Sequence, residues 1–179
     1  MKKLDTTTKS ILTTHPVKRI TSLPEPNSPG YFGAIRKFDI HTGIDLYCDN
    51  HAEVYAIENG IVVGIEKFTG EHADSPWWEN TWAILIESVS GVIVYGEIVI
   101  CDTIQIGDTI HAGQCLGKVI KVLKADKGKN PTAMLHLELY DHGTISTVWW
   151  KLNTPKPDNL LNPLLIPSIK IQYEEEYHD

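Results

Sequence analysis

The chain has 179 residues, of which 42% are hydrophobic and 22% charged. Chains of roughly 100–200 residues with this balance usually bury one hydrophobic core, so a large multidomain protein is excluded. The formal net charge of −7 excludes a broadly basic surface, and we expect neither a nucleic-acid partner nor attraction to an anionic membrane. The apolar stretches are far shorter than the roughly 20 residues that span a bilayer.

The first segment, residues 1–30, is rich in Thr, Ser and Pro and ends in the Pro-rich run 23–30. Because proline fixes its φ angle and lacks an amide donor, this run is unsuited to regular β-ladders. We therefore expect a loosely packed N-terminal arm. Its first residues contain no continuous apolar core of the kind that a secretory signal needs.

The redox state of the cysteines bears on location. Cys48, Cys101 and Cys115 have no C-x-x-C spacing, which favours reduced thiols over a disulfide scaffold, with one bridge and a free thiol as the alternative. As the chain stands we expect a cytoplasmic protein. If a leader has been removed, an extracellular or periplasmic location is expected instead.

From residue 31 to about 167, short β-branched runs alternate with Gly, Asn and Asp, a pattern typical of an all-β domain. The candidate strands lie at 54–56, 60–68, 82–87, 92–95, 109–110, 115–122 and 134–140. Turn-forming residues at 58–60 and 88–91 predict hairpins between antiparallel neighbours. No long segment shows a sustained helical period, so we expect an antiparallel sheet or barrel-like sandwich over 31–167 and a solvated acidic tail over 168–179.

Two polar residues, His41 and Asp45, stand four positions apart. In a flat strand this spacing would separate their Cα atoms by about 13 Å, too far for both to hold one metal ion. Gly43 lies between them, and because it has no Cβ it permits a bend or bulge that brings the two side chains together. A pair of metal ligands is therefore one interpretation of His41 and Asp45.

A third candidate ligand lies in the alternating segment 134–139. Its leucines would face a core, so Met134, His136 and Glu138 share the opposite face. With His41 and Asp45, His136 would complete the three protein ligands of an open zinc site of the kind found in hydrolases. The same pattern also suits histidines that make only structural hydrogen bonds. Glu138 would either orient the His136 imidazole through its second nitrogen or lie in solvent.

The order of several segments gives these residues a wider context. Residues 36–46 (RKFDIHTGIDL) and 54–62 (VYAIENGIV), the turn 107–117 (GDTIHAGQCLG), the strand 134–139 (MLHLEL) and Asn162-Pro163 follow one another along the chain. This order resembles the lysostaphin-type zinc metallopeptidases, the glycyl-glycine and DD-endopeptidases that cut peptidoglycan cross-links, over residues 33 to 165.

The resemblance implies a fold, a metal and a ligand. The fold is the family's antiparallel β-structure, often called a duplicated hybrid motif. The metal is zinc, held by His41, Asp45 and His136. The partner is a peptide or peptidoglycan-like ligand in a groove over the metal.

Two positions depart from the family's pattern. In active members, the first His of a His-x-His strand and a His in a Tyr-x-His-Leu segment assist proton transfer, and these positions are Met134 and Glu97 here. A thioether cannot exchange a proton. A carboxylate beside zinc is the general base in His-Glu-x-x-His metalloproteases, so Glu97 is the candidate catalytic residue. As alternatives, Glu97 is a fourth metal ligand that closes the site, or a surface carboxylate at a strand end.

Five tryptophans fall in two segments. The loop 69–82 carries Trp77, Trp78 and Trp82, and Trp149 and Trp150 follow later in the chain. If these rings are exposed near the metal groove, they would form a stacking platform for a ligand. The alternative is that they pin a long loop to the domain.

Three functions are compatible with these features. The leading hypothesis is a divergent zinc metallo-endopeptidase or hydrolase that acts on peptides or cell-wall-like amide bonds. The second is a catalytically inactive zinc-bearing binding module on the same fold. The third is a lipoyl or biotinyl carrier, because the turn 107–117 also resembles such domains and Lys127 lies in a turn, but this function would leave the candidate metal ligands without a role.

Overall fold

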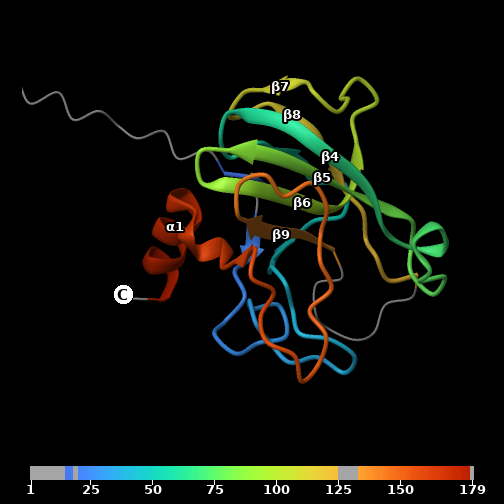
Figure 1. Cartoon of the computed structure of the whole chain (residues 1–179), viewed down its shortest axis with the longest axis vertical. Helices are drawn as coiled ribbons and strands as arrows, with labels where there is room; N and C mark the ends of the chain where they lie inside the picture. Colours follow the sequence, from blue (N-terminus) through green and yellow to red (C-terminus); the bar gives the residue numbers. More distant parts are fainter. Residues whose placement is uncertain (1–14, 18–19, 125–132, 178–179) are drawn as a thin grey trace, which may run out of the picture.

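The computed structural model describes residues 15–17, 20–124 and 133–177. Figure 1 shows that these residues form mainly β-strands, with the helix α1 at one side. The strands are β1 (Ile20–Ser22), β2 (Ile44–Cys48), β3 (Glu53–Tyr55), β4 (Gly60–Thr69), β5 (Thr81–Ser88), β6 (Gly91–Ile100), β7 (Thr109–Ile110), β8 (Cys115–Val119), β9 (Met134–Tyr140) and β10 (Leu160–Leu161). The helical elements are the 3-10 helices η1 (Glu71–Ala73) and η2 (Pro163–Leu165) and the α-helix α1 (Pro167–Tyr177).

The strands form an antiparallel sheet in the order β1-β2-β9-β6-β5-β4-β7, with β10 beside β9 and β8 pairing with both β3 and β6. In Figure 1, β4, β5 and β6 run side by side, and β9 follows on the other side of β6. The predicted all-β, antiparallel fold is confirmed. The strands predicted at 109–110 and 134–140 have the observed bounds, whereas β2 was not predicted.

The two predicted hairpin turns have different outcomes. Residues 88–91 join β5 to β6, with Ser88 paired to Gly91, as predicted. The hairpin expected at 58–60 is wrong, because β3 pairs with β8 while β4 pairs with β5 and β7. Glu58 in this turn instead accepts hydrogen bonds from the amide and the hydroxyl of Ser90. The turn is thereby tied to the β5–β6 hairpin.

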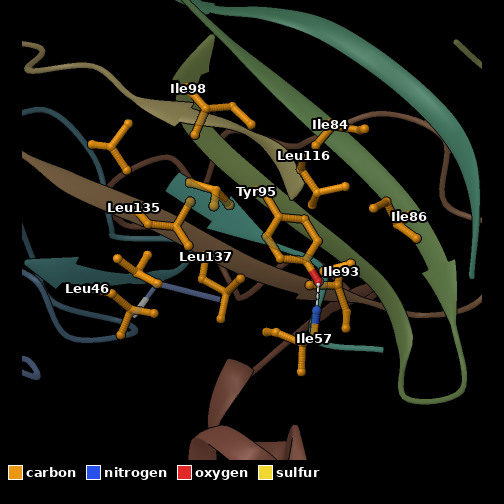
Figure 2. Packing of buried hydrophobic residues seen from close by; sticks show 14 of the residues in the cluster. Leu46, Ile57, Ile84, Ile86, Ile93, Tyr95, Ile98, Leu116, Leu135 and Leu137 are labelled. Carbon is orange, nitrogen blue, oxygen red and sulfur yellow. Dashed lines mark hydrogen bonds between the residues drawn. The ribbon is translucent and has the colours of Figure 1, made fainter. Parts of the chain in front are cut away.

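Apolar side chains cover both faces of the central strands. Figure 2 shows part of the larger cluster, in which the Tyr95 hydroxyl accepts a hydrogen bond of 2.9 Å from the Ile57 amide. The smaller cluster consists of Ala83, Leu85, Val92, Val94, Tyr140 and Leu160. Neighbouring residues of β5 and β6 belong to different clusters, as strand alternation requires. These strands are therefore buried on both sides and give the site a rigid support.

Part of the expected N-terminal arm belongs to the sheet. β1 pairs with β2, Val17 forms an isolated bridge with Val54, and Val17 and Leu23 are 1% and 2% exposed. Val17, β1 and Leu23 are therefore part of the fold, whereas Glu25, Pro26, Asn27 and Pro29 are exposed as the predicted loose packing requires. The physical reason is that Pro24 follows β1 and does not interrupt it, so the apolar residues before it can be buried. The remainder of the arm, 1–14 and 18–19, lies outside the described residues.

The start of the expected acidic tail is helical. Pro167 occupies the first position of α1, where the missing amide donor is tolerated, and Ile169 is fully buried. The ring of Tyr173 lies 6.1 Å from that of Tyr31. Burial of this side therefore attaches α1 to the domain, although its sequence lacks the helical period that would predict it. Neither α1 nor the shorter described helices have the length and hydropathy needed to cross a membrane.

Candidate metal centre

The three predicted metal ligands meet at the junction of β2 and β9. Asp45 and His136 are direct partners in the antiparallel pair of these strands, an arrangement that brings side chains on one face together. His41 precedes β2, where its amide donates to the Ala34 carbonyl and its own carbonyl accepts from the Gly33 amide. The three side chains are nearly inaccessible to solvent, with 2%, 4% and 5% exposure for His41, Asp45 and His136.

The potential ligand atoms converge on one point. His41 Nε2 lies 3.1 Å from His136 Nδ1 and 3.1 Å from Asp45 Oδ1, and His136 Nδ1 lies 3.0 Å from the same oxygen. Three ligands of a tetrahedral zinc ion, each about 2.0–2.2 Å from the metal, would be spaced by roughly 3.4 Å. Among the described residues, these three form the group that could hold a metal ion.

The other ring nitrogen of each imidazole is already engaged. His41 Nδ1 donates to the Tyr31 carbonyl at 2.9 Å, and His136 Nε2 donates to Glu138 Oε1 at 2.9 Å. Because a carbonyl only accepts, His41 directs an unprotonated Nε2 toward Asp45 in its neutral form. Such contacts orient metal-ligating imidazoles in proteins. The donor set therefore fits a zinc ion.

Gly43 allows the close approach of the two strands. A Cβ on this residue would lie 2.3 Å from the Leu137 carbonyl oxygen and 2.9 Å from His136 Nε2. Its φ angle is not in the left-handed region. The bend predicted at Gly43 is therefore achieved by the absence of a side chain against β9 and not by a special backbone angle.

Burial and the neighbouring charges shift the pKa values of the three candidate ligands. Burial would raise the pKa of Asp45, but the neighbouring imidazoles of His41 and His136 hold it well below its ordinary value. Burial lowers the pKa of His41. Burial also acts to lower the pKa of His136, yet its hydrogen bonds to Asp45 and Glu138 raise that pKa to about 10. A proton thus supplies positive charge here, and a bound metal ion would replace it.

Two further residues orient the ligands. Arg36 Nη2 donates to Asp45 Oδ2 at 2.7 Å and to the Pro29 carbonyl at 2.9 Å, which leaves Asp45 Oδ1 directed toward the imidazoles. Glu138 is 1% exposed and accepts hydrogen bonds from His136, Thr42 and Tyr140. Of the two interpretations of Glu138, the structure has the one in which it orients His136.

The roles of Arg36, Thr42 and Tyr140 at this centre were not predicted from the sequence. Tyr140 alternates with His136 and Glu138 along β9, so the sequence pattern could have predicted that the three side chains lie on the same face of the strand. The contact between Thr42 and Glu138 could not be predicted, because these residues are 96 positions apart in the sequence.

Glu97 reaches the groove over this centre through a β-bulge. Trp82 and Ile84 in β5 pair with Ile98 and Tyr95 in β6, so β6 contains one extra residue between these pairs. Glu97 has a left-handed φ of 62°. Bulges of this kind turn a side chain out of the normal alternation. Glu97 therefore lines the same groove as His41 and His136.

The Glu97 carboxyl is buried without enough hydrogen bonds to offset the cost of its burial. Its Oε2 atom is buried without a hydrogen-bond partner among the described residues. Burial, followed by the charge of Asp45, raises its pKa to about 8. Glu97 is not one of the three residues whose ligand atoms converge, and its assignment as the catalytic residue stays a prediction. Met134 pairs with Tyr47 of β2 and does not line the groove.

The groove over the centre has a volume of about 390 Å³, within the range of small-ligand sites. Trp78 and Trp149 both line it, and Trp149 is 65% exposed. Trp82 instead packs edge-on against His72 at 4.7 Å. Trp78 and Trp149 therefore lie where a stacking platform would need them, whereas the contact of Trp82 with His72 ties the loop to β5. Lys127, the residue that the carrier alternative requires, lies outside the described residues.

Comparisons with known proteins identify the fold. No protein-family model matches the sequence, and no curated protein does. Among solved structures, a peptidase M23 candidate from Pseudomonas aeruginosa matches with a TM-score of 0.51 and 17% identity, covering 89% of this chain and 52% of that one. The catalytic domain of the antimicrobial peptidase lysostaphin from Staphylococcus simulans matches with a TM-score of 0.50 and 19% identity, covering 79% and 89%.

This chain spans about half the length of the Pseudomonas protein and most of the lysostaphin catalytic domain. At 17% and 19% sequence identity, these matches show a similar backbone fold and nothing further. The protein therefore has the all-β fold of the lysostaphin-like M23 peptidases.

Proposed function

We propose that this protein is a divergent zinc-dependent hydrolase that cleaves amide bonds in peptides or in cell-wall-like cross-links. The observation that carries the proposal is the convergence of His41, Asp45 and His136, with ligand atoms 3.0–3.1 Å apart. Two nitrogens and one carboxylate oxygen are a usual protein ligand set for catalytic zinc, with a position left for the reaction. The fold shared with M23 peptidases supports the same function.

Zinc at this centre would supply Lewis acidity, which polarises an amide carbonyl and lowers the pKa of water. Glu97 would accept the proton of the attacking water and then transfer it to the leaving amine. Burial favours this role, because a carboxyl whose pKa is raised toward neutrality is both a better base and a usable acid. Arg36 and Glu138 would keep the ligands in place during the reaction.

A peptide chain is the ligand that suits the groove. The groove is lined by His41 and His136 together with Trp78, from the loop before β5, and Trp149, from the loop after β9. Such rings contribute apolar contact area with little conformational freedom to lose. Backbone amides of the ligand would then lie across the metal centre.

Metal content tests the centre itself. We expect one zinc per chain by atomic emission after dialysis against a zinc buffer, and loss of that zinc in His136→Ala. At a free zinc concentration of 100 times Kd, binding should stabilise the fold by about 2.7 kcal/mol. Unchanged zinc in His136→Ala would remove the ligand assignment.

Turnover tests the base. Glu97→Gln should retain zinc and lose hydrolysis of peptide and peptidoglycan-fragment substrates. Glu71→Gln, at an exposed carboxylate in η1, is the matched control and should keep wild-type turnover. Retained turnover in Glu97→Gln would show that Glu97 is not the base.

One observation favours a second candidate, a zinc-bearing binding module without catalysis. In the family that the chain resembles, the position of Met134 holds a histidine that assists proton transfer, and Met134 itself does not line the groove. The module predicts stoichiometric zinc and tight ligand binding, with no turnover in the wild type or in either variant. Zinc content and turnover, measured on the wild type and the variants above, therefore distinguish the hydrolase from the binding module.

A further inference from the structure

The hydroxyl of Tyr140 lies between the metal centre and one wall of the groove. It donates a hydrogen bond of 2.9 Å to Glu138 Oε2 and accepts one of 3.1 Å from the Val148 amide. We propose that Tyr140 is a positioning residue that links the metal ligand His136 to the loop carrying Trp149, so that metal affinity and the position of this wall are coupled. The coupling rests on the metal site of the proposed function.

The first branch of the link runs through Glu138. Oε1 of this carboxylate accepts from His136 Nε2 at 2.9 Å and from the Thr42 hydroxyl, and Oε2 accepts from Tyr140. Within the described part of the chain, the Tyr140 hydroxyl is the hydrogen-bond donor to Oε2, and its loss would leave the plane of the carboxylate fixed through Oε1 alone. The imidazole of His136 would then lose its fixed acceptor, and such acceptors orient metal ligands.

The second branch runs through the loop between β9 and β10. The amide and hydroxyl of Thr147 donate to the Glu66 carboxylate, and the Ile40 amide donates to the Trp150 carbonyl at 2.9 Å. The bond from Val148 to Tyr140 lies between these two anchors. Together they fix the backbone on both sides of Trp149, whose exposed ring lines the groove.

Tyr140 can serve both branches because its own ring is immobile. It is fully buried, it is paired with Val92 of β6 on one side, and it is paired with Leu160 of β10 on the other. A hydroxyl on a ring held in this way is a fixed point. A shift of the Trp149 loop is therefore transmitted to Glu138 and His136, and metal binding reciprocally restrains the loop.

Tyr140→Phe tests the link, because it removes one hydroxyl and keeps the packed ring. Tyr95→Phe is the matched control: it also removes a hydroxyl from a fully buried ring and leaves one amide, that of Ile57, without its partner. Both variants should lower the melting temperature. Only Tyr140→Phe should weaken zinc binding, by about 10–100-fold in competition with a chelating dye. In the metal-free protein, only this variant should speed hydrogen exchange at the Val148 amide, which loses its acceptor.

Three results would overturn the inference. These are wild-type zinc affinity in Tyr140→Phe, unchanged exchange at the Val148 amide, and an equal loss of zinc affinity in Tyr95→Phe. If the wild type binds no zinc, the proposed function fails while the link is still decided by NMR of the metal-free protein. Faster exchange of the His136 Nε2 proton together with the Val148 amide in Tyr140→Phe supports the link, and wild-type exchange of either proton refutes it.

Discussion

Replacing Gly43 with Ala should damage both the fold and the metal centre. The new Cβ would lie 2.3 Å from the Leu137 carbonyl oxygen, 2.9 Å from His136 Nε2 and 3.0 Å from Glu138 Cγ. Two of these atoms belong to the face of β9 that holds the candidate ligand, and the third belongs to its backbone. Because ordinary contacts of a Cβ begin near 3.4 Å, the start of β2 must move away from β9 by about 1 Å.

The expected free-energy loss follows from this overlap. Overpacking of a well-packed region costs about 1–3 kcal/mol, and contact with immobile backbone places Gly43→Ala at the upper end. A domain of this size then melts roughly 6–12 °C lower. Zinc affinity should fall as well, because Asp45 and His136 lie on the two strands that are forced apart.

Differential scanning calorimetry and chelator competition measure the two effects. Gly107→Ala is the control, because Gly107 has a φ of 96° but no atom within 4 Å of an added Cβ. It should cost about 1 kcal/mol of backbone strain and leave zinc affinity unchanged. If Gly43→Ala melts within about 2 °C of the wild type and binds zinc equally well, the close approach of β2 and β9 is not what positions the ligands.

Two other substitutions test the surroundings of the centre. Arg36→Ala removes the hydrogen bond to Asp45 Oδ2 and should lower zinc affinity about tenfold by chelator competition; wild-type affinity would show that the ligands alone orient Asp45. Glu97→Gly should be more stable than Glu97→Ala by about 1 kcal/mol in thermal melts without metal, because glycine tolerates the left-handed backbone. His51→Gly, at an exposed residue with φ of 66°, measures the backbone effect alone, and an equal or lower stability of Glu97→Gly would contradict the bulge geometry.

The sequence predicted the parts of the fold that local patterns determine. Alternation of Leu135, Leu137 and Leu139 placed His136 on the opposite face of β9, and that placement is observed. β2 was not predicted, because its five residues include Asp45 and Cys48 and have no alternating polar pattern: four of them are buried. The helix α1 was missed because its helical period is weak and its stability comes from burial of Ile169.

Contacts between segments that are far apart in the sequence could not be predicted from local patterns. The pairing of β3 with β8 overrides the turn at 58–60, whose residues suit a hairpin that does not form. The orientation of His41 depends on the carbonyl of Tyr31, which any residue could supply. Such backbone contacts leave no trace in residue identity, so the ligands were predictable but the groups that hold them were not.

Glu97 unites the fold and the proposed chemistry. It combines two unfavourable features, a left-handed backbone in a residue with a Cβ and a buried carboxylate oxygen without a partner among the described residues. Glycine at this position would remove both, so the structure alone does not account for a glutamate here. Strain of this kind concentrates at functional sites, where the surrounding fold maintains it. If Glu97→Gly is more stable than the wild type but loses turnover, the bulge serves to present a carboxylate to the groove. If Glu97→Gly is less stable than the wild type, Glu97 is a structural residue, and the binding module becomes the better account of this protein.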